Sequence, residues 1–363
     1  MSDKKAIIIT GVTGQDGANM SEFLLKETPH ELHCIVRRAC GRDPRQVEDL
    51  KKLGGERFNI IYGDLTDSIS INRSVREIQP DYFINFGANS FVGDSWDAPL
   101  HTFDVNATGV MRCLEAIRMY QPKCRFYSAG SSEELGNVDY SPQDLKHPLK
   151  PRSPYAASKA AARHIVKVWR ESYGLYAVHS ILFNHEGTRR GPEFVTRKIT
   201  MGVSRIYHEL KDVDKWRHRH GAKPELNPIE LGNLDAKRDW SDSEDFVKGI
   251  WMMLNQDEPK DYLLASGETH SIREFVEKAF FHANILDGVW EGEGVDEKFV
   301  HQSNGWKINL VTVNPEFYRP AEVDLLWGDP SFAESELGWK RTISFDNLVE
   351  RMVKFDIEEG KSK

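Results

Sequence analysis

Several features that would place this chain in a specialised class are scarce or missing. The 363 residues include only four cysteines. They show no CxxC and no paired histidine spacing, which argues against structural zinc and predicts free thiols in a reducing, cytoplasmic setting. No run of about 18 apolar residues is present, so no membrane span is predicted. The apolar stretch behind the N-terminal lysines ends at Thr10, too early for a secretory signal.

Positive charge is also in short supply. The formal net charge of −8 argues against general nucleic-acid binding. A small anionic ligand would need a local cluster of arginines against this global sign. The remaining composition, 39% hydrophobic and 29% charged, is typical of a soluble globular protein. The length of 363 residues exceeds the usual single domain, so one large composite domain or two interleaved lobes is expected.

The first half of the chain alternates between strand-like and helix-like periods. Short runs rich in β-branched and aromatic residues lie at Ala6–Thr10, Leu32–Val36, Phe58–Tyr62, Tyr82–Phe86 and Phe126–Ala129. Amphipathic stretches between them lie at Ala18–Lys26, Ser68–Ile78 and Thr102–Tyr120. The alternation predicts right-handed βαβ units and an α/β fold, a doubly wound parallel sheet of the Rossmann type.

The second half predicts a smaller, mixed α/β lobe that would bind the substrate. The clearest elements are helices at Pro154–Tyr173, Asp245–Leu254 and Ile272–Ala283, and a strand at Tyr176–Phe183. We expect a dinucleotide-binding domain from residues 1–183 plus 229–264, and a substrate lobe from 184–228 plus 265–363. The polar stretch Lys211–Pro228 is interpreted as a surface insertion, either a solvated loop or a contact to ligand or subunit. The tail Glu358–Lys363 is expected to be disordered.

A glycine-rich turn, GVTGQDG, directly follows the first predicted strand. Its glycines, Gly11, Gly14 and Gly17, stand where a helix opens. Glycines permit a tight turn there and let the backbone approach a pyrophosphate, whose charge the helix N-terminus favours. The spacing GxxGxxG is typical of short-chain dehydrogenase folds. A glycine-rich turn without ligand is the alternative, but the strand before and the helix after favour a dinucleotide site.

The ends of the next strands bear on which dinucleotide binds. Arg37 and Arg38 follow the second strand, where a carboxylate would suit the ribose of NAD and arginine suits the 2′-phosphate of NADP. A pair of solvated loop arginines is the alternative. Asp64 follows the third strand, where it would accept from adenine or cap a helix. Phe86–Ser90 supplies small residues under the dinucleotide.

Tyr155 and Lys159 lie four residues apart on one face of the long predicted helix. A free phenol has a pKa near 10 and is a poor base at neutral pH. An ammonium at about 4 Å supplies roughly 4 kcal/mol at an effective dielectric of 20, about three pK units. The spacing therefore predicts that Lys159 lowers the pKa of Tyr155 and makes it a base. An exposed helix pair is the alternative.

Ser131 and Glu133 follow the fifth strand, at the edge where a parallel sheet carries its chemistry. The Ser131 hydroxyl would polarise a substrate oxygen beside Tyr155. The Glu133 carboxylate would move a proton in an elimination, a step that a simple alcohol dehydrogenase does not need. Alternatively, Ser131 or Ser132 caps a helix and Glu133 favours its first turn.

Longer motifs carry a resemblance that spans nearly the whole chain. They are GVTGQDG, IVRR, YGDLTD, the SSE step, PRSPYAASK, LFNHEGTRRGPEFVTRKI, GNLDAKRDW and YRPAEVDLLWGDPSFAESELGW. Together they resemble the GDP-mannose 4,6-dehydratases, which belong to the extended short-chain dehydrogenase/reductases. The resemblance implies transient C4 oxidation, loss of water from C5 and C6, and return of hydride to C6, giving GDP-4-keto-6-deoxymannose.

The resemblance also implies a role for individual residues. The catalytic set would be Ser131, Glu133 and Tyr155, supported by Lys159. The NADP site, which includes Tyr155 and Lys159, would further contain Gly11, Val12, Thr13, Gly14, Gln15, Asp16, Gly17, Arg37, Arg38, Ala39, Cys40, Asp64, Leu65, Phe86, Gly87, Ala88, Asn89, Ser90, His101, His185 and Arg190. The GDP-sugar would contact Ser90, Asn184, Lys198, Arg238, Arg319 and Glu322. A homodimer or homotetramer is implied, with the Arg37–Arg45 loop as a candidate contact to a neighbour's cofactor.

Three departures from the family pattern leave alternatives open, and one of them is the Lys211–Pro228 insertion. The usual TSELYG is here SSEELG, and the exit of the fourth strand is GANSFV, with Asn89 and Phe91 for the usual Gln and His. These changes, with the insertion, bear on the sugar, so a GDP-linked heptose or N-acetylhexosamine remains an alternative. A 4-epimerase or 4-reductase of the same fold would share Tyr155 and Lys159 but not need Glu133. A non-catalytic NADP-binding regulatory protein would need none of them.

Overall fold

A seven-stranded parallel sheet forms the larger part of the molecule. The computed structural model describes residues 4–38, 44–136, 138–220, 226–303, 306–317, 323 and 325–361. The strands run in the order β11 (Tyr262–Leu264), β6 (Ala177–Leu182), β5 (Arg125–Ala129), β4 (Tyr82–Asn85), β1 (Ala6–Thr10), β2 (Glu31–Val36) and β3 (Phe58–Tyr62). Every neighbouring pair is parallel. The predicted doubly wound sheet is confirmed.

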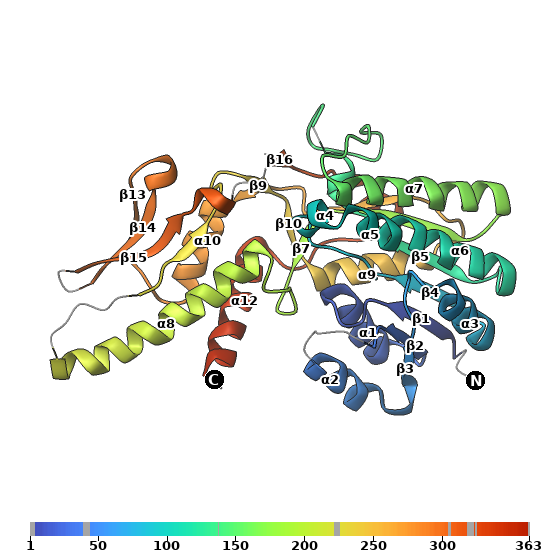
Figure 1. Ribbon diagram of the computed structural model, residues 1–363, viewed down its shortest axis with the longest axis horizontal. Coiled ribbons are helices and arrows are strands. Elements are labelled where there is room, and N and C mark those ends of the chain that lie inside the picture. The colour runs from blue at the N-terminus through green and yellow to red at the C-terminus, as the bar shows by residue number, and fades with distance from the viewer. Residues whose placement is uncertain are drawn as a thin grey trace.

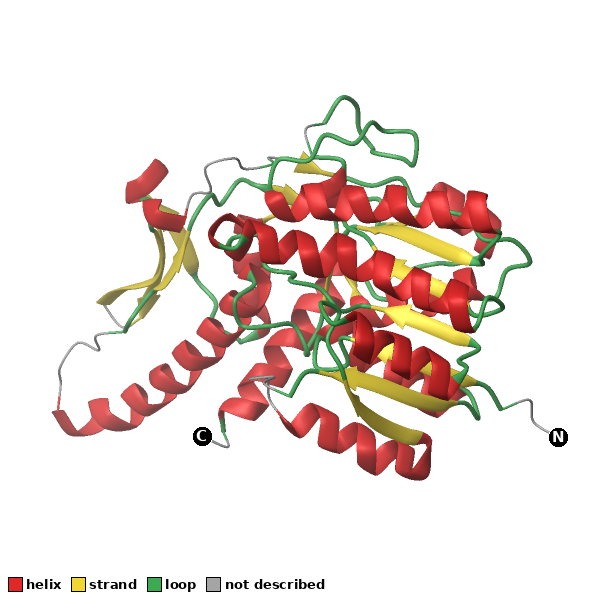
Figure 2. Cartoon of the chain, turned by 45° about the vertical axis from the view of Figure 1, so that its right-hand side comes forward, coloured by secondary structure: helices red, strands yellow, loops and turns green. Residues whose placement is uncertain are grey.

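Helices cover both faces of this sheet (Figures 1 and 2). One layer contains α1 (Gln15–Glu27), α2 (Pro44–Gly54), α9 (Ser243–Leu254) and α11 (Ser331–Leu337). The other contains α3 (Ser68–Ile78), α5 (Pro99–Phe103), a π-helical segment (Asp104–Thr108), α6 (Gly109–Tyr120) and α7 (Pro154–Tyr173). Ile7 and Ile9 pack into the first layer's core and Ile8 into the second's. Burial on both faces explains why the successive residues Ile7, Ile8 and Ile9 are all apolar, rather than alternating with polar ones.

A smaller lobe packs beside the sheet and has its own core (Figure 1). It contains the helices α8 (Val195–His220), α10 (Ile272–His282) and α12 (Phe345–Gly360). Its four-stranded sheet runs β13 (Gly288–Glu291), β14 (Lys298–Ser303), β15 (Trp306–Val313) and β8 (Ile229–Leu231). Short strands link the lobes: β7 (Asn184–Glu186) with β10 (Trp240–Asp242), and β12 (His270–Ser271) with β9 (Lys237–Arg238) and β16 (Leu325–Leu326).

Three expectations about these elements are wrong. Residues 229–231 were expected in the nucleotide domain, but β8 pairs with β15 in the smaller lobe. The stretch from Lys211 was expected as a loop, yet α8 continues to His220, because residues 211–220 contain no proline or glycine to end the helix; residues 221–225 lie outside the described part. The tail was expected to be disordered, but α12 runs to Gly360 because its apolar face packs on α8 and α10.

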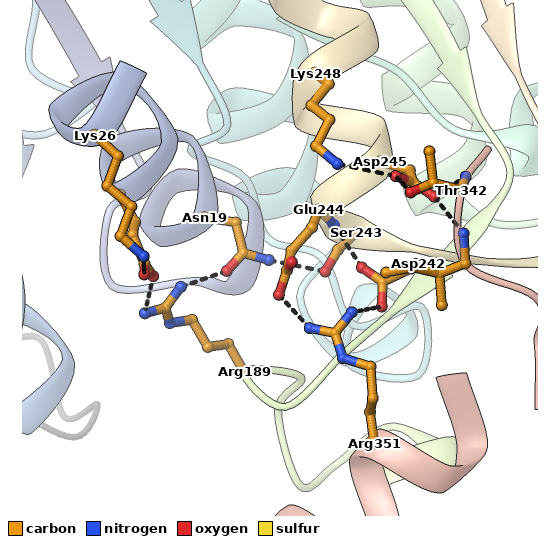
Figure 3. Close-up of polar contacts among 12 residues, drawn as sticks. Asn19, Lys26, Arg189, Asp242, Ser243, Glu244, Asp245, Lys248, Thr342 and Arg351 are labelled. Carbon is orange, nitrogen blue, oxygen red and sulfur yellow. Dashed lines mark hydrogen bonds and ion pairs between the residues drawn. The ribbon is translucent and has the colours of Figure 1, made fainter. Parts of the chain in front are cut away.

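Polar side chains join α1, α9 and α12 where the lobes meet (Figure 3). Asn19 of α1 donates to the Ser243 hydroxyl at 2.8 Å and accepts from Arg189 at 2.6 Å. Arg351 of α12 reaches Asp242 at 2.8 Å. Burial raises the pKa of Asp242 to about 6, although the nearby guanidinium acts in the opposite direction. These contacts fix the smaller lobe against the end of the domain that contains the seven-stranded sheet.

Asp245 is the fully buried carboxylate of this joint, and its removal should destabilise the fold. It accepts the backbone N–H groups of Thr342 and Ile343 at 2.6 and 3.0 Å and the Thr342 hydroxyl at 2.6 Å. Asp245→Ala leaves these donors without their acceptor, so we expect the free energy of unfolding to fall by about 3 kcal/mol. Urea denaturation measures it. Lys248→Ala removes only an exposed partner of the same carboxylate and should cost less than about 1 kcal/mol; equal losses would contradict the prediction.

Candidate active site

A cavity of about 610 Å³ lies at the carboxyl ends of the central strands and reaches into the smaller lobe. Its walls come from the segments after β4 and β5, from α7, from β7 and the loop behind it, and from the start of α8. The carboxyl edge is where open parallel sheets bind ligands.

Within the described residues, no three or more His, Cys, Asp or Glu side chains are grouped to hold a metal ion. No helix among those residues is long and apolar enough to cross a membrane.

The predicted glycine turn joins β1 to α1 beside this cavity. Gly11 has a φ of +75°, and a Cβ there would lie 2.8 Å from the Phe86 carbonyl carbon. Gly17 packs against the turn, where a Cβ would lie 2.3 Å from the Gly11 oxygen. Gly14 is the N-cap residue of α1 and supplies no side-chain cap. The first amides of α1 are therefore left to a ligand, as a pyrophosphate site requires.

Besides Tyr155 and Lys159, six residues predicted to line the dinucleotide site line the cavity: Asp16, Phe86, Ala88, Ser90, His185 and Arg190. Asp16 and His185 also pair with each other, with 2.9 Å between Oδ2 and Nε2. Burial opposes both charges, but the pair overcomes it: the pKa of Asp16 is lowered and the pKa of His185 is raised. The Gln15 amide braces the turn by donating to the His185 carbonyl at 3.0 Å.

Other predicted dinucleotide residues lie away from the cavity. Arg37 and Arg38 are exposed at the end of β2, with the Arg38 guanidinium 5.4 Å from the centre of the Tyr62 ring. Asp64 accepts from the Thr66 amide and hydroxyl; the N-cap of α3 is Asp67.

The other described residues that were predicted for the dinucleotide site do not line the cavity. The Asn89 side chain donates to Thr102 at 2.9 Å, away from the cavity, and His101 is exposed on α5. Val12 and Leu65 are buried in the two cores. Thr13 lies within the glycine turn, and the Gly87 amide donates to Thr10 at 2.9 Å. Ala39 and Cys40 lie outside the described residues.

The four predicted catalytic residues, Ser131, Glu133, Tyr155 and Lys159, all line the cavity. Helix α7 begins at Pro154, and the Ser153 side chain caps it, so Tyr155 and Lys159 stand in its first turns. The Ser131 hydroxyl hydrogen-bonds the Tyr155 phenol. The Lys159 ammonium donates to the Ala129 carbonyl at 2.8 Å and lies 5.8 Å from the centre of the Tyr155 ring.

The net shift of the Tyr155 pKa is opposite in direction to the one predicted from its spacing to Lys159. Burial raises the pKa of Tyr155 to about 12, and the carboxylates of Glu133 and Glu134 act in the same direction, while the Ser131 hydrogen bond and Arg190 oppose them. Burial also lowers the pKa of Lys159 to about 8. Burial is the largest cause of both shifts, and each favours the uncharged form of its group.

Ser131 and Glu133 line the cavity and also take part in a helix cap, so the catalytic and the capping interpretations of this segment are compatible. Ser131 caps a short 3₁₀ helix, η3 (Ser132–Glu134), and its hydroxyl accepts the Glu133 amide at 3.3 Å. The reciprocal contact of the capping box comes from Glu134, whose carboxylate accepts the Ser131 amide at 2.8 Å. The cap therefore presents Ser131 and Glu133 to the cavity.

The predicted substrate residues Ser90, Asn184, Lys198 and Arg238 also line the cavity. The Asn184 side-chain oxygen is buried and makes no hydrogen bond to any described residue. The Lys198 ammonium lies 3.6 Å from the centre of the Phe317 ring, and burial lowers its pKa. Arg238 is buried on β9 and donates to the Lys237 carbonyl. The other two predicted contacts, Arg319 and Glu322, lie outside the described residues.

Two features of the site were not predicted as such. Phe91, Trp96 and Phe194 line the cavity, and the Phe91 and Phe194 rings meet edge to face at 5.9 Å. The aromatic residues in GANSFV and GPEFV were the available signal. Behind the wall of the site, Glu134 pairs with His179 of β6. The second glutamate of SSEELG was visible in the sequence, but no sequence pattern indicated that it pairs with His179.

A parallel sheet with a glycine turn after β1 and a Ser–Tyr–Lys set between β5 and α7 defines the extended short-chain dehydrogenase/reductases. A family model described as GDP-mannose 4,6 dehydratase matches residues 8–352. The chain belongs to this family. It is 45% identical to "GDP-mannose 4,6 dehydratase" of Drosophila melanogaster, over 98% of this chain and 87% of that protein. It is 42% identical to the protein of the same name from Homo sapiens, over 98% of this chain and 92% of the relative.

Solved structures share the fold at lower identity. The dTDP-glucose 4,6-dehydratase DesIV from Streptomyces venezuelae, with NAD and TYD bound, matches with a TM-score of 0.77, 19% identity and 98% coverage of both chains. RMD from Pseudomonas aeruginosa, complexed with NADPH, matches with a TM-score of 0.73 and 20% identity, over 98% of this chain and all of that one (100%). These likenesses confirm the fold.

Proposed function

We propose that this chain is an NADP-dependent dehydratase that converts GDP-mannose into GDP-4-keto-6-deoxymannose and water. The observation that carries the proposal is the convergence of Ser131, Glu133, Tyr155 and Lys159 on one cavity. Tyr155 and Lys159 suit oxidation of an alcohol, and Glu133 adds the carboxylate that an elimination needs. The family relatives carry the name of this activity.

The residues around the glycine turn fit a nicotinamide dinucleotide. The turn brings the backbone close to the exit of β4, and the uncapped N-terminus of α1 favours a pyrophosphate. Arg37 and Arg38 stand at the end of β2, where a 2′-phosphate would lie. A bound NADP would supply the hydride acceptor for oxidation at the sugar's C4 and, once reduced, the hydride donor for C6.

The side chains of the site then move the protons. Tyr155 accepts the proton of the 4-hydroxyl, while Ser131 hydrogen-bonds the same oxygen. A ketone at C4 acidifies C5, and Glu133 removes the C5 proton and passes it to the departing 6-hydroxyl, which leaves as water. As hydride reaches C6, Tyr155 returns to C5 the proton that it took from the 4-hydroxyl. Asn184, Lys198 and Arg238 hold the nucleotide sugar, with the two cations available to the diphosphate. No net oxidation results.

The product assay tests the proposal directly. The purified protein, given GDP-mannose and catalytic NADP, should yield a product lighter by one water in mass spectrometry, without net consumption of coenzyme. Stoichiometric turnover of NADPH, or a product isomeric with the substrate, would instead indicate a 4-reductase or a 4-epimerase. The aromatic wall of Phe91, Trp96 and Phe194 bears on the choice of sugar, so the panel includes a GDP-heptose and a GDP-linked N-acetylhexosamine.

Arg38 tests the choice of NADP over NAD. Arg38→Ala should weaken NADP binding by about 10- to 100-fold, because a charge-assisted contact to phosphate contributes roughly 1.5–3 kcal/mol. NAD, which lacks the 2′-phosphate, should bind the variant as it binds the parent. Titration calorimetry with both coenzymes measures the difference. Arg118→Ala, which loses an exposed guanidinium on α6, serves as the control. An equal loss for both coenzymes would count against a 2′-phosphate contact.

The alkaline side of the pH profile should report Lys159. Its pKa of about 8 means that the ammonium loses its proton as pH rises through this value. The positive charge that favours ionisation of Tyr155 is then lost, so kcat should fall about tenfold per unit above pH 8. Stopped assays across pH 6–10 measure the profile. Lys159→Arg keeps its charge throughout this range and should lose the decline; a parent profile that stays flat to pH 10 would contradict the assignment.

Assembly and cellular setting complete the proposal. Apolar side chains on α5, α6 and α7 are exposed, among them Leu100 at 87% and Val168 at 50%. Such a face favours a homodimer or homotetramer, and light scattering in line with gel filtration measures the mass.

Cys34, Cys113 and Cys124 are buried free thiols, which suits a reducing cytoplasm.

A further inference from the structure

Glu134 and His179 form a fully buried pair directly behind the catalytic segment. Both side chains have 0% exposure, and His179 Nε2 lies 3.1 and 3.3 Å from the two Glu134 oxygens. Glu134 ends η3 and His179 lies in β6, so the contact ties the segment after β5 to the neighbouring strand. Neither side chain lines the cavity.

Glu134 also connects this pair to the reacting groups. Its Oε1 accepts the Ser131 amide at 2.8 Å, which sets the backbone of the residue whose hydroxyl hydrogen-bonds Tyr155. A chain of contacts therefore runs from His179 through Glu134 and Ser131 to the phenol. Glu133 precedes Glu134 in the same short helix and depends on the same cap for its placement.

The sheet is adapted to hold the pair. A Cβ at Gly130 would lie 2.3 Å from His179 Nε2 and 2.5 Å from Glu134 Oε1, so only glycine leaves room for both side chains. His179 Nδ1 makes no hydrogen bond to a described residue. This favours the tautomer with its proton on Nε2, because an unpaired lone pair costs less than an unpaired N–H. His179 thus donates and Glu134 accepts.

A capping box alone does not require this arrangement. An exposed glutamate satisfies the N-cap amide equally well, whereas burial of a carboxylate and an imidazole adds a desolvation cost that only good partners offset. We infer that Glu134 and His179 are a positioning pair, which holds Ser131 and Glu133 in reactive geometry and supplies a negative charge behind Lys159. The inference rests on the proposed function only because its effects are measured through the proposed reaction.

Several ionisable groups face the pair and share its electrostatics. They are Lys159 and Tyr155 of α7, Tyr127 of β5, and Asp261 ahead of β11, which is itself bound to Arg163 and Arg170. The Glu134 charge favours the protonated form of Lys159 and disfavours ionisation of both tyrosines. Removing that charge without changing shape should therefore move the alkaline limb of the pH profile to lower pH.

Two substitutions at Glu134 separate position from charge. Glu134→Leu removes the acceptor of the Ser131 amide, and kcat should fall roughly 10- to 100-fold with KM within about twofold, the scale of a misplaced catalytic group. Glu134→Gln keeps an acceptor oxygen, so it should retain most of kcat at pH 7 but show its alkaline decline at lower pH. His179→Leu should resemble Glu134→Leu, and the double variant should lose little more than either single variant, because the two act together.

A matched control isolates these effects from lost stability. Asp245→Asn alters another fully buried carboxylate, remote from the cavity, and should lower the melting temperature without changing kcat or the pH profile. NADP titration shows whether each variant retains its coenzyme site. If Glu134→Leu does not fold, the pH profile of Glu134→Gln still decides. Parent-like kcat and pH profiles in the Glu134 variants, or an equal loss of kcat in Asp245→Asn, would overturn the inference. A parent enzyme that yields no dehydrated product would instead contradict the proposed function, and the comparison would then use the reaction it does catalyse.

Discussion

Tyr155→Phe is expected to lower kcat with GDP-mannose by about 10²–10⁴, the usual contribution of a positioned acid–base group. The Tyr155 phenol lines the cavity and hydrogen-bonds Ser131, and phenylalanine keeps the ring but lacks the hydroxyl. Because its pKa is about 12 in the resting site, ionisation must draw on the positive charge assembled around the bound substrate. The loss should appear in kcat, with NADP affinity within about twofold of the parent.

Tyr262→Phe is the matched control for this prediction. Tyr262 is a fully buried tyrosine at the sheet edge, and its hydroxyl makes no hydrogen bond to a described residue. Removal of this hydroxyl should change neither kcat nor the equilibrium constant of unfolding by more than about twofold. If Tyr155→Phe retained activity close to the parent, another group would have to take the 4-hydroxyl proton, and the assignment of the phenol would fail.

The sequence was sufficient to predict the parallel sheet and to select four residues that all line one cavity and are proposed here as catalytic, because local patterns encode them. Apolar strands alternate with amphipathic helices, and the glycine turn and the Tyr155–Lys159 pair are each defined within a few residues. The helix predicted from Pro154 to about Tyr173 is confirmed as α7, in which the Ser153 side chain caps the start and Gly174, with a φ of +65°, ends the helix. These signals need no knowledge of the remainder of the chain.

Features that depend on distant segments were not predictable in the same way. Burial around Tyr155 reverses the expected direction of its pKa shift, and burial is a property of the assembled site. Residues 229–231 form a strand only because β15 lies beside them, 75 or more positions later in the chain. The pairing of Glu134 with His179 joins positions separated by 45 residues. Spacing along the sequence carries no record of such contacts.

Glu133→Gln should abolish dehydration while leaving oxidation at C4 intact. The amide keeps the size of the side chain and the cap of η3, but it cannot accept the C5 proton at neutral pH. In D₂O the parent should incorporate deuterium at C5, and the variant should incorporate none. Reduced coenzyme should accumulate on the variant after mixing with GDP-mannose, because the hydride is taken but has no eliminated product to return to. Overall turnover should fall by at least about 10²-fold.

Glu193→Gln provides the comparison, since Glu193 also lines the cavity but stands on the loop before α8 rather than beside the catalytic serine. It should retain deuterium exchange at C5 whatever its effect on KM. This outcome would assign the elimination to one carboxylate rather than to the general acidity of the cavity. Exchange at C5 that persists in Glu133→Gln and disappears in Glu193→Gln would reverse the roles of the two residues. If dehydration persisted without either carboxylate, Tyr155 would have to accept both the 4-hydroxyl proton and the C5 proton. One phenolate can accept the second proton only after it has released the first.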